Sequence, residues 1–174
     1  GVLIFIYVLF HRPEPSRQMP GEAAAPVYPV STAARLQRVH LYFSATDHTS
    51  LLSETRELPD SGDPSELGKS IVQALVEGPR GSGVRTLPAT TVVRDVFITD
   101  DGTAYVDFSE NVTEDHPGGV QTELLSIYSV VNSLALNLEG ISAVKLLIGG
   151  KEADTLAGHM DLRYPYQTNI LLLK

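Results

Sequence analysis

The chain has 174 residues, a formal net charge of −8 and no cysteine. This length suits one domain of ordinary size with an appendage. The acidic balance argues against nucleic-acid binding, which requires clustered Lys and Arg. The lack of cysteine excludes disulfides, thiolate metal sites and cysteine nucleophiles.

The first feature along the chain is an apolar run from Val2 to Phe10, followed by His11 and Arg12. A helix needs about 20 residues to cross a bilayer. Because the sequence starts without methionine, we interpret residues 1–10 as the outer end of a longer transmembrane or signal-anchor helix. An apolar tail ordered by a partner and a buried strand are the alternatives. The interpretation predicts a single-pass anchor in the cytoplasmic membrane, with the rest of the chain on the periplasmic or outer side.

Residues 11–37 are expected to be a Pro/Ala-rich linker. Proline removes backbone donors and favours extended conformations. At about 3.1 Å per residue, a linker of this length would reach roughly 80 Å. Five prolines recur in it: Pro13, Pro15, Pro20, Pro26 and Pro29.

The folded domain is predicted for residues 38–166, and residues 167–174 form a tail that the sequence does not place. Apolar residues alternate over 39–43, which indicates a half-buried strand. Residues 51–58 indicate an edge strand.

A first helix is predicted to begin at Asp63 and to end at Gly78. Asp63 is a typical N-cap residue and Pro64 suits the first helical position. Glu66 is placed to close a capping box with Asp63. The apolar residues that follow recur at helical spacing and predict one buried face.

An antiparallel hairpin is predicted from two β-rich runs, Thr91 to Thr99 and Thr103 to Ser109. The Asp101-Gly102 pair between them tolerates the positive φ angles of a tight turn. A second amphipathic helix follows Gly118-Gly119 and runs to Leu138.

Val144 to Ile148 indicates a last buried strand. The order strand, helix, hairpin, helix, strand predicts an α/β (α+β) fold. We expect a two-layer sandwich in which two helices cover one face of a mixed β-sheet.

Several catalytic motifs occur only as fragments. Gly68-Lys69-Ser70 lacks the leading glycine of a phosphate loop and lies inside the first helix. Ser142 to Lys145 matches SxxK, but the serine introduces a strand and the partner motifs are absent from the sequence. The acidic run of Asp107, Glu110, Glu114, Asp115 and His116 does not have the order of a calcium loop and indicates a solvated loop. We therefore expect no catalytic residue, no metal and no cofactor.

Two groups of polar residues remain as candidates for binding a ligand or a partner. Glu54 and Arg56 are two residues apart and share one face of the predicted edge strand. Glu123 lies in the first turn of the second helix, just after Gly118 and Gly119, where the helix dipole favours a carboxylate. The simpler interpretation is a surface ion pair and a helix-start charge, and the alternative is a polar cluster that shapes a ligand groove or a subunit contact.

An ordered set of short motifs resembles the GerMN domain of sporulation and spore-germination proteins. The resemblance covers about residues 38–165 in a single copy. Its segments are Val39–Phe43, Glu54–Arg56, Ala74–Pro79, Leu87–Thr90, Ala104–Ser109, Gly118-Gly119 with Glu123, and Val144–Gly150.

The resemblance implies a non-enzymatic module of the bacterial envelope. GerMN domains occur in lipoproteins and membrane-anchored proteins, and they resemble the ring-building modules of sporulation secretion complexes. We expect a tethered binding or assembly module that contacts the membrane through its N-terminal segment and binds a protein partner, a second copy or a cell-wall ligand. Two alternatives stay open. One is a subunit of a larger membrane or filament assembly that uses its apolar N-terminus, and the other is a cell-wall enzyme with Glu54 and Glu123 as its carboxylates.

Overall fold

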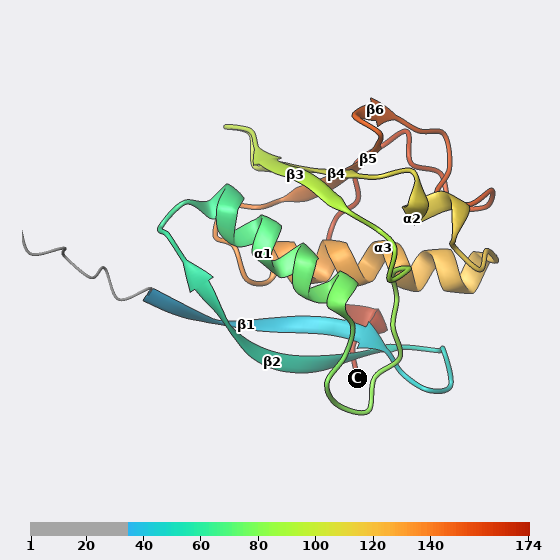
Figure 1. The fold of residues 1–174 in the computed structure, drawn as a ribbon, viewed down its shortest axis with the longest axis horizontal. Helices are drawn as coiled ribbons and strands as arrows, with labels where there is room; N and C mark the ends of the chain where they lie inside the picture. The colour runs from blue at the N-terminus through green and yellow to red at the C-terminus, as the bar shows by residue number, and fades with distance from the viewer. Residues whose placement is uncertain (1–34) are drawn as a thin grey trace, which may run out of the picture. The chain divides into compact units, whose positions relative to one another are not determined.

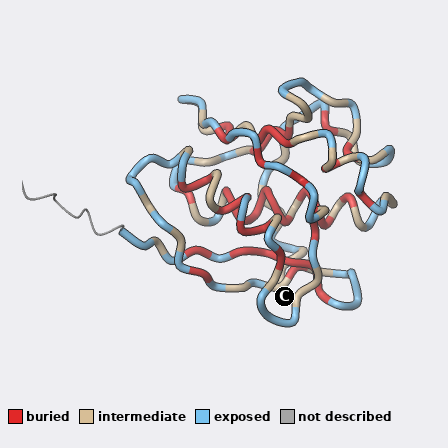
Figure 2. Tube along the Cα trace, viewed as in Figure 1, coloured by how far each residue is buried: buried red, intermediate tan, exposed pale blue. Residues whose placement is uncertain are grey.

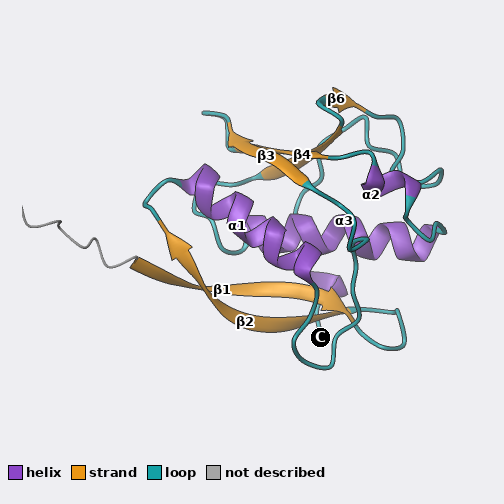
Figure 3. Ribbon diagram, viewed as in Figure 1, coloured by secondary structure: helices purple, strands orange, loops and turns teal. Residues whose placement is uncertain are grey.

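The computed structural model describes residues 35–174, so the predicted anchor and residues 11–34 of the predicted linker lie outside this range. Residues 35–37, which the sequence also assigns to the linker, belong to the first strand instead. The described residues form three layers, in which two helices lie between two sheets (Figure 1, Figure 3). The first sheet pairs β1 (Arg35–Ser44) with β2 (Leu51–Asp60). The helices are α1 (Pro64–Glu77) and α3 (Val120–Ala135). No helix in residues 35–174 is long and apolar enough to cross a membrane.

The second sheet has four strands in the order β3-β4-β5-β6. Strands β3 and β4 form an antiparallel hairpin, β5 runs parallel to β4, and β6 returns antiparallel to β5. The remaining elements are a one-turn helix, α2, and a short 3₁₀ helix, η1. The bounds of these six elements are β3 (Val93–Ile98), β4 (Thr103–Phe108), β5 (Ala143–Ile148), β6 (Lys151–Glu152), α2 (Asn111–Glu114) and η1 (Ile170–Leu172).

The mixed α/β class and the predicted order of elements are confirmed, while the arrangement of the strands differs from the expected single sheet. Both helices pack on one face of the mixed sheet, but β1 and β2 form a separate sheet on their other side. The prediction of one sheet was wrong because alternating apolar residues identify a strand without identifying its neighbour. The fold is therefore a three-layer sandwich instead of a two-layer one.

Helix α1 begins and ends as the sequence indicates. The carboxylate of Asp63 accepts a hydrogen bond from Ser65 N at 2.8 Å, and Pro64 occupies the first turn. The expected capping box with Glu66 is not formed, because Asp63 N donates to Ser61 Oγ at 3.4 Å instead. The helix ends at Gly78, whose φ of 93° is one that residues with a Cβ rarely adopt.

The tight turn between β3 and β4 confirms the predicted hairpin. Asp101 Oδ1 accepts a hydrogen bond from Thr103 N at 3.0 Å, and Gly102 has a φ of 82°. A Cβ on Gly102 would lie 2.4 Å from the carbonyl oxygen of Gly140. Glycine is thus required here both for the backbone conformation and for the approach of the loop that follows α3.

One hydrophobic core connects the two sheets through the helices. Both sides of α3 are covered, so ten of its residues are buried (Figure 2). The fully buried members of the core come from β1, α1, α3, β4 and β5, and they include Val39, Leu41, Ile71, Leu75, Val106, Ile127, Leu134 and Val144.

The outer edge of β1 is closed by polar side chains of α3. Ser129 Oγ donates to the carbonyl oxygen of Tyr42 at 2.5 Å, and Ser133 Oγ accepts from Tyr42 N at 3.1 Å. One turn further, the amide of Asn137 bonds both His40 N and His40 O, at 2.8 and 2.7 Å. Side chains of a helix therefore take the place of a neighbouring strand along this edge.

The C-terminal residues, which the sequence did not place, pack against β2 and α3. Asn132 and the backbone of Asn169 exchange two hydrogen bonds of 3.0 and 3.1 Å. Leu173 forms a parallel bridge with Leu51, and Lys174 N donates to Leu51 O at 3.0 Å. The tail thus covers the beginning of β2.

Candidate functional site

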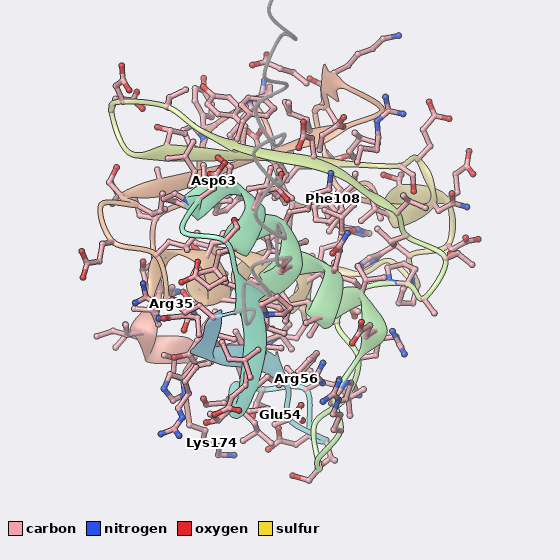
Figure 4. All side chains as sticks on the ribbon, turned by 60° about the vertical axis from the view of Figure 1, so that its left-hand side comes forward. Arg35, Glu54, Arg56, Asp63, Phe108 and Lys174 are labelled. Carbon is pink, nitrogen blue, oxygen red and sulfur yellow. The ribbon has the colours of Figure 1, made fainter. Side chains whose placement is uncertain are left out.

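Glu54 and Arg56 lie together on the face of β2 that is turned toward α1, as their spacing predicts (Figure 4). Arg56 Nε donates to Glu54 Oε1 at 2.8 Å. The arginine side chain is only 2% exposed, and its guanidinium lies over the ring of Phe43 with 5.5 Å between Cζ and the ring centre. The pair therefore joins a buried arginine to a partly buried carboxylate, with 19% of the Glu54 side chain exposed, and is not a surface ion pair.

Two arginines cap the C-terminal carbonyls of α1, where the helix dipole is negative. Arg56 donates to the carbonyl oxygens of Ala74 at 3.2 Å and Gly78 at 2.5 Å. Arg85, from the loop before β3, donates to those of Val76 and Glu77. Helix α1 has no basic residue in its own last turn, so residues distant in the sequence supply the cap.

The carboxylate of Glu54 fixes the loop that follows α1. Its Oε2 accepts hydrogen bonds from Arg80 N and Gly81 N, both at 2.8 Å. Partial burial by itself raises the pKa of Glu54, but the hydrogen bonds from Arg56, Gly81 and Arg80 outweigh this effect and hold the pKa below its ordinary value. Glu54 is therefore ionised at neutral pH, and its oxygens are already engaged.

Glu123 is fully buried and joins the start of α3 to the loop after β6. Its carboxylate accepts hydrogen bonds from His159 Nδ1 at 2.7 Å, His159 N at 3.1 Å and Met160 N at 2.8 Å. Burial raises the pKa of Glu123, but these hydrogen bonds outweigh burial, and the pKa lies below its ordinary value. The predicted helix-start carboxylate thus holds a distant loop in place.

Gly118 and Gly119 lead into α3 next to a buried histidine. Gly118 N donates to Nδ1 of His116 at 3.0 Å, so Nε2 carries the proton and donates to Ser126 Oγ at 2.9 Å. Burial lowers the pKa of His116, and the charge of Glu123 opposes this only in part. His116 was assigned to a solvated acidic loop from the sequence; the loop instead contains α2, and its histidine is buried.

The structure does not unite the predicted site residues into one cluster. Glu54 and Arg56 bond to the end of α1 and its following loop, whereas Glu123 bonds to the loop at residues 159–160. No hydrogen bond or ion pair among the described residues links the two groups. Residues 35–174 also contain no group of three His, Asp or Glu side chains that could hold a metal ion.

Two hollows flank the capped end of α1. The larger has a volume of about 470 Å³ and lies between α1 and the segment that leads into β3. The smaller, of about 130 Å³, lies between β2 and the loop at residues 81–83. We call the larger hollow the α1 groove; it is lined by Gln73, Val76, Glu77, Arg85, Ala89, Thr91, Val92 and Val93.

The α1 groove combines apolar walls with a few polar groups. Val92 is 57% exposed and Val93 forms part of the core beneath it. Glu77 and Arg85 stand at the helix end, and Arg85 is already bonded to α1 carbonyls. Apolar walls with a few polar groups are typical of sites that bind a ligand. No sequence motif marks this groove, because its walls come from two separate segments of the chain.

The comparison with protein families decides the identity of the domain. The model of the Germane family, described as "Sporulation and spore germination", matches residues 40–154. The chain belongs to this family. Among curated proteins none matches the chain.

Solved structures of GerMN domains share the fold. The tandem GerMN domains of the sporulation protein GerM from Bacillus subtilis match with 25% identity and a TM-score of 0.63, over 76% of this chain and 46% of theirs. The first GerMN domain of the same protein matches with 23% identity and a TM-score of 0.58, over 78% and 98%. A candidate lipoprotein from Clostridium perfringens matches with 24% identity and a TM-score of 0.56, over 76% and 87%.

These matches confirm that the chain is similar to GerMN domains, as its sequence motifs indicate. The chain spans about half the length of the tandem GerM structure, in agreement with a single GerMN copy. The family's description names sporulation and germination and no chemical reaction.

Proposed function

We propose that this GerMN domain is a membrane-tethered, extracytoplasmic module that binds or assembles with a partner protein and catalyses no reaction. The observation that carries the proposal is the α1 groove, an open and largely apolar hollow beside a helix end that is held rigid by Arg56 and Arg85. Rigid, mostly apolar concavities with few polar groups are typical of binding sites.

The ionisation and the hydrogen bonds of the Glu54 and Glu123 carboxylates favour a binding function over hydrolysis. A glycoside hydrolase needs one protonated and one ionised carboxyl group across a cleft. Both Glu54 and Glu123 have lowered pKa values, and each is engaged by hydrogen bonds from different loops. Neither is suited to donate a proton at neutral pH.

Two observations support the proposed membrane tether: the N-terminal sequence and a similar fold in one relative. Residues 2–10 are wholly apolar and precede a proline-rich segment. A similar fold occurs in a candidate lipoprotein, a class of protein held at a membrane surface. We infer that the domain acts outside the cytoplasmic membrane, at a distance from the bilayer that the proline-rich segment before β1 sets.

A cross-linking experiment in cells tests the proposal. A photoreactive amino acid replaces Val92 in the α1 groove of the full chain, and a matched control replaces Val120, which is 60% exposed at the start of α3. We expect a discrete cross-linked protein from position 92 and none from position 120. Equal products from both positions, or none from position 92, would contradict a binding role of the groove.

Two further arms separate the alternatives. A probe at Phe5 reports whether the apolar N-terminus contacts protein, as a subunit of a larger assembly requires, or lipid. Sedimentation of the full chain with isolated peptidoglycan tests a cell-wall ligand. Loss of peptidoglycan binding in Val92→Glu, but not in Val120→Glu, would assign that ligand to the groove.

A further inference from the structure

The two edges of the β1-β2 sheet differ in whether their outward backbone groups are hydrogen-bonded. Along β1, the backbone groups that point away from β2 are bonded: those of Tyr42 by α3, those of His40 by Asn137 just after α3, and those of Ser44 by Val84. In an antiparallel pair, the residues opposite these point their backbone groups to the other edge. The register places Ser53 opposite Tyr42 and Thr55 opposite His40.

We call the outward backbone groups of Ser53, Thr55 and Glu57 the β2 edge. Within residues 35–174, no hydrogen bond is made to these groups, and all three residues are exposed. Natural sheets usually cover or charge such an edge, because it pairs readily with another strand. Glu57 is the one charged residue of the three, and its carboxylate lies 3.8 Å from Arg38 on the outer face.

The β2 edge has defined limits at both ends. At one end Leu51 is already bonded to Lys174 N, so pairing with a strand stops there. At the other end the outward residue is Pro59, which has no N–H to donate. The open stretch therefore consists of three outward residues with Thr55 at its centre.

We propose that the β2 edge binds the β2 edge of a second copy of this chain in antiparallel orientation. With Thr55 opposite Thr55, Ser53 of each copy lies opposite Glu57 of the other. All three outward N–H groups and all three carbonyls of each copy are then bonded, and the limits at Leu51 and Pro59 coincide with the ends of the pairing. The arrangement is a twofold one, the commonest symmetry of homodimers.

The side chains of the paired edges are compatible. Thr55 meets Thr55, a favourable cross-strand pair, and the carboxylate of Glu57 meets the hydroxyl of Ser53, so no like charges lie opposite one another. The product is a continuous four-stranded sheet in the order β1-β2-β2-β1. The inference deepens the proposed function, because a membrane tether raises the local concentration of copies and favours such an otherwise weak contact.

Disulfide trapping tests the contact, since the full chain contains no cysteine. Opposite residues of a hydrogen-bonded antiparallel pair have Cα atoms about 5.5 Å apart, within disulfide range. Thr55→Cys is expected to form linked dimers of the full chain in detergent micelles at least about tenfold faster than His40→Cys, a control on the same face whose copies would lie about 14 Å apart. Equal rates would overturn the proposal.

Mixing two variants tests the register. Ser53→Cys combined with Glu57→Cys should yield mainly the mixed dimer, because these positions lie opposite one another only in the antiparallel pairing centred on Thr55. A preference for Ser53-Ser53 or Glu57-Glu57 dimers would overturn that pairing.

A third measurement removes one backbone donor. Thr55→Pro deletes an outward N–H, whereas Thr55→Val keeps it. Sedimentation of the full chain should show self-association for Thr55→Val and its loss for Thr55→Pro, with unchanged circular dichroism. Equal association of the two variants would count against the β2 edge. Because none of these variants touches Val92, the outcome is independent of the α1 groove experiment.

Discussion

The fully buried carboxylate of Glu123 accepts a 2.7 Å hydrogen bond from Nδ1 of His159, whose side chain is 47% exposed. The two residues lie 36 positions apart, one at the start of α3 and the other in the loop after β6. Backbone N–H groups of His159 and Met160 complete the shell of the carboxylate. The pair thus fastens the loop to the helix.

We expect Glu123→Leu to lower the free energy of unfolding by about 2–3 kcal/mol, because its side chain cannot accept and leaves the N–H groups of His159 and Met160 unsatisfied. His159→Ala removes only one half-exposed partner and is expected to cost about 1 kcal/mol or less. Urea denaturation of both variants measures the difference. A larger loss for His159→Ala would contradict this account of the loop.

Acid is expected to destabilise the domain in two steps. The folded pKa of His116 is below 6.5, so the unfolded state binds more protons under that pH, and stability falls as pH decreases from 6.5. The folded pKa of Glu123 is below 4.5, so its contribution is complete above pH 4.5 and is lost as pH falls further. Urea midpoints between pH 8 and pH 4 should decline less steeply from pH 7 to 5 in His116→Gln. If the urea midpoints of the original chain and of His116→Gln decline equally with pH, protonation of His116 is not the cause of the acid destabilisation.

A double-mutant cycle measures the coupling of Glu54 and Arg56. Arg56→Met should cost about 3 kcal/mol, because it leaves Glu54 without its cation and the carbonyl oxygens of Ala74 and Gly78 without their donor. The double variant with Glu54→Gln should lose less than the sum of the single losses, by about 1–2 kcal/mol. Arg38→Met is the control, since Arg38 pairs with Glu57 at 3.8 Å on the exposed face, and it should cost less than about 0.5 kcal/mol. Additive losses would show that the two side chains act separately.

Two glycines with positive φ should differ in their tolerance of alanine. At Gly78 an added Cβ would lie 2.6 Å from the guanidinium of Arg85, whereas at Gly118 no atom outside the neighbouring residues lies within 4 Å. Gly118→Ala should cost about 1 kcal/mol from backbone strain alone, and Gly78→Ala about 2–3 kcal/mol because it also displaces the helix cap. Thermal melts of both variants test this order, which equal shifts in Tm would contradict.

Much of the local structure could be predicted because the relevant signals are close together in the sequence. The cap at Asp63, the turn at Gly102 and the shared face of Glu54 and Arg56 each depend on a few neighbouring residues. Such short-range preferences are fixed by side-chain and backbone geometry.

The long-range contacts could not be predicted in the same way. His159 reaches Glu123, and Arg85 reaches the end of α1, through loops that carry no distinctive motif. The separation of β1 and β2 from the other strands had one readable signal: polar residues at spacings of four, Ser129 and Ser133 in α3 and Asn137 just beyond its end. A polar stripe usually indicates solvent, but here it indicates an uncovered strand edge.

The shared core of the two sheets has a consequence for unfolding. Helices α1 and α3 contribute apolar side chains to both sheets, so neither sheet can detach without exposing the residues that support the other. Local detachment of the β1-β2 pair is therefore nearly as costly as melting the whole unit. The domain should lose its tertiary structure in a single cooperative transition, with both sheets disappearing at the same denaturant concentration.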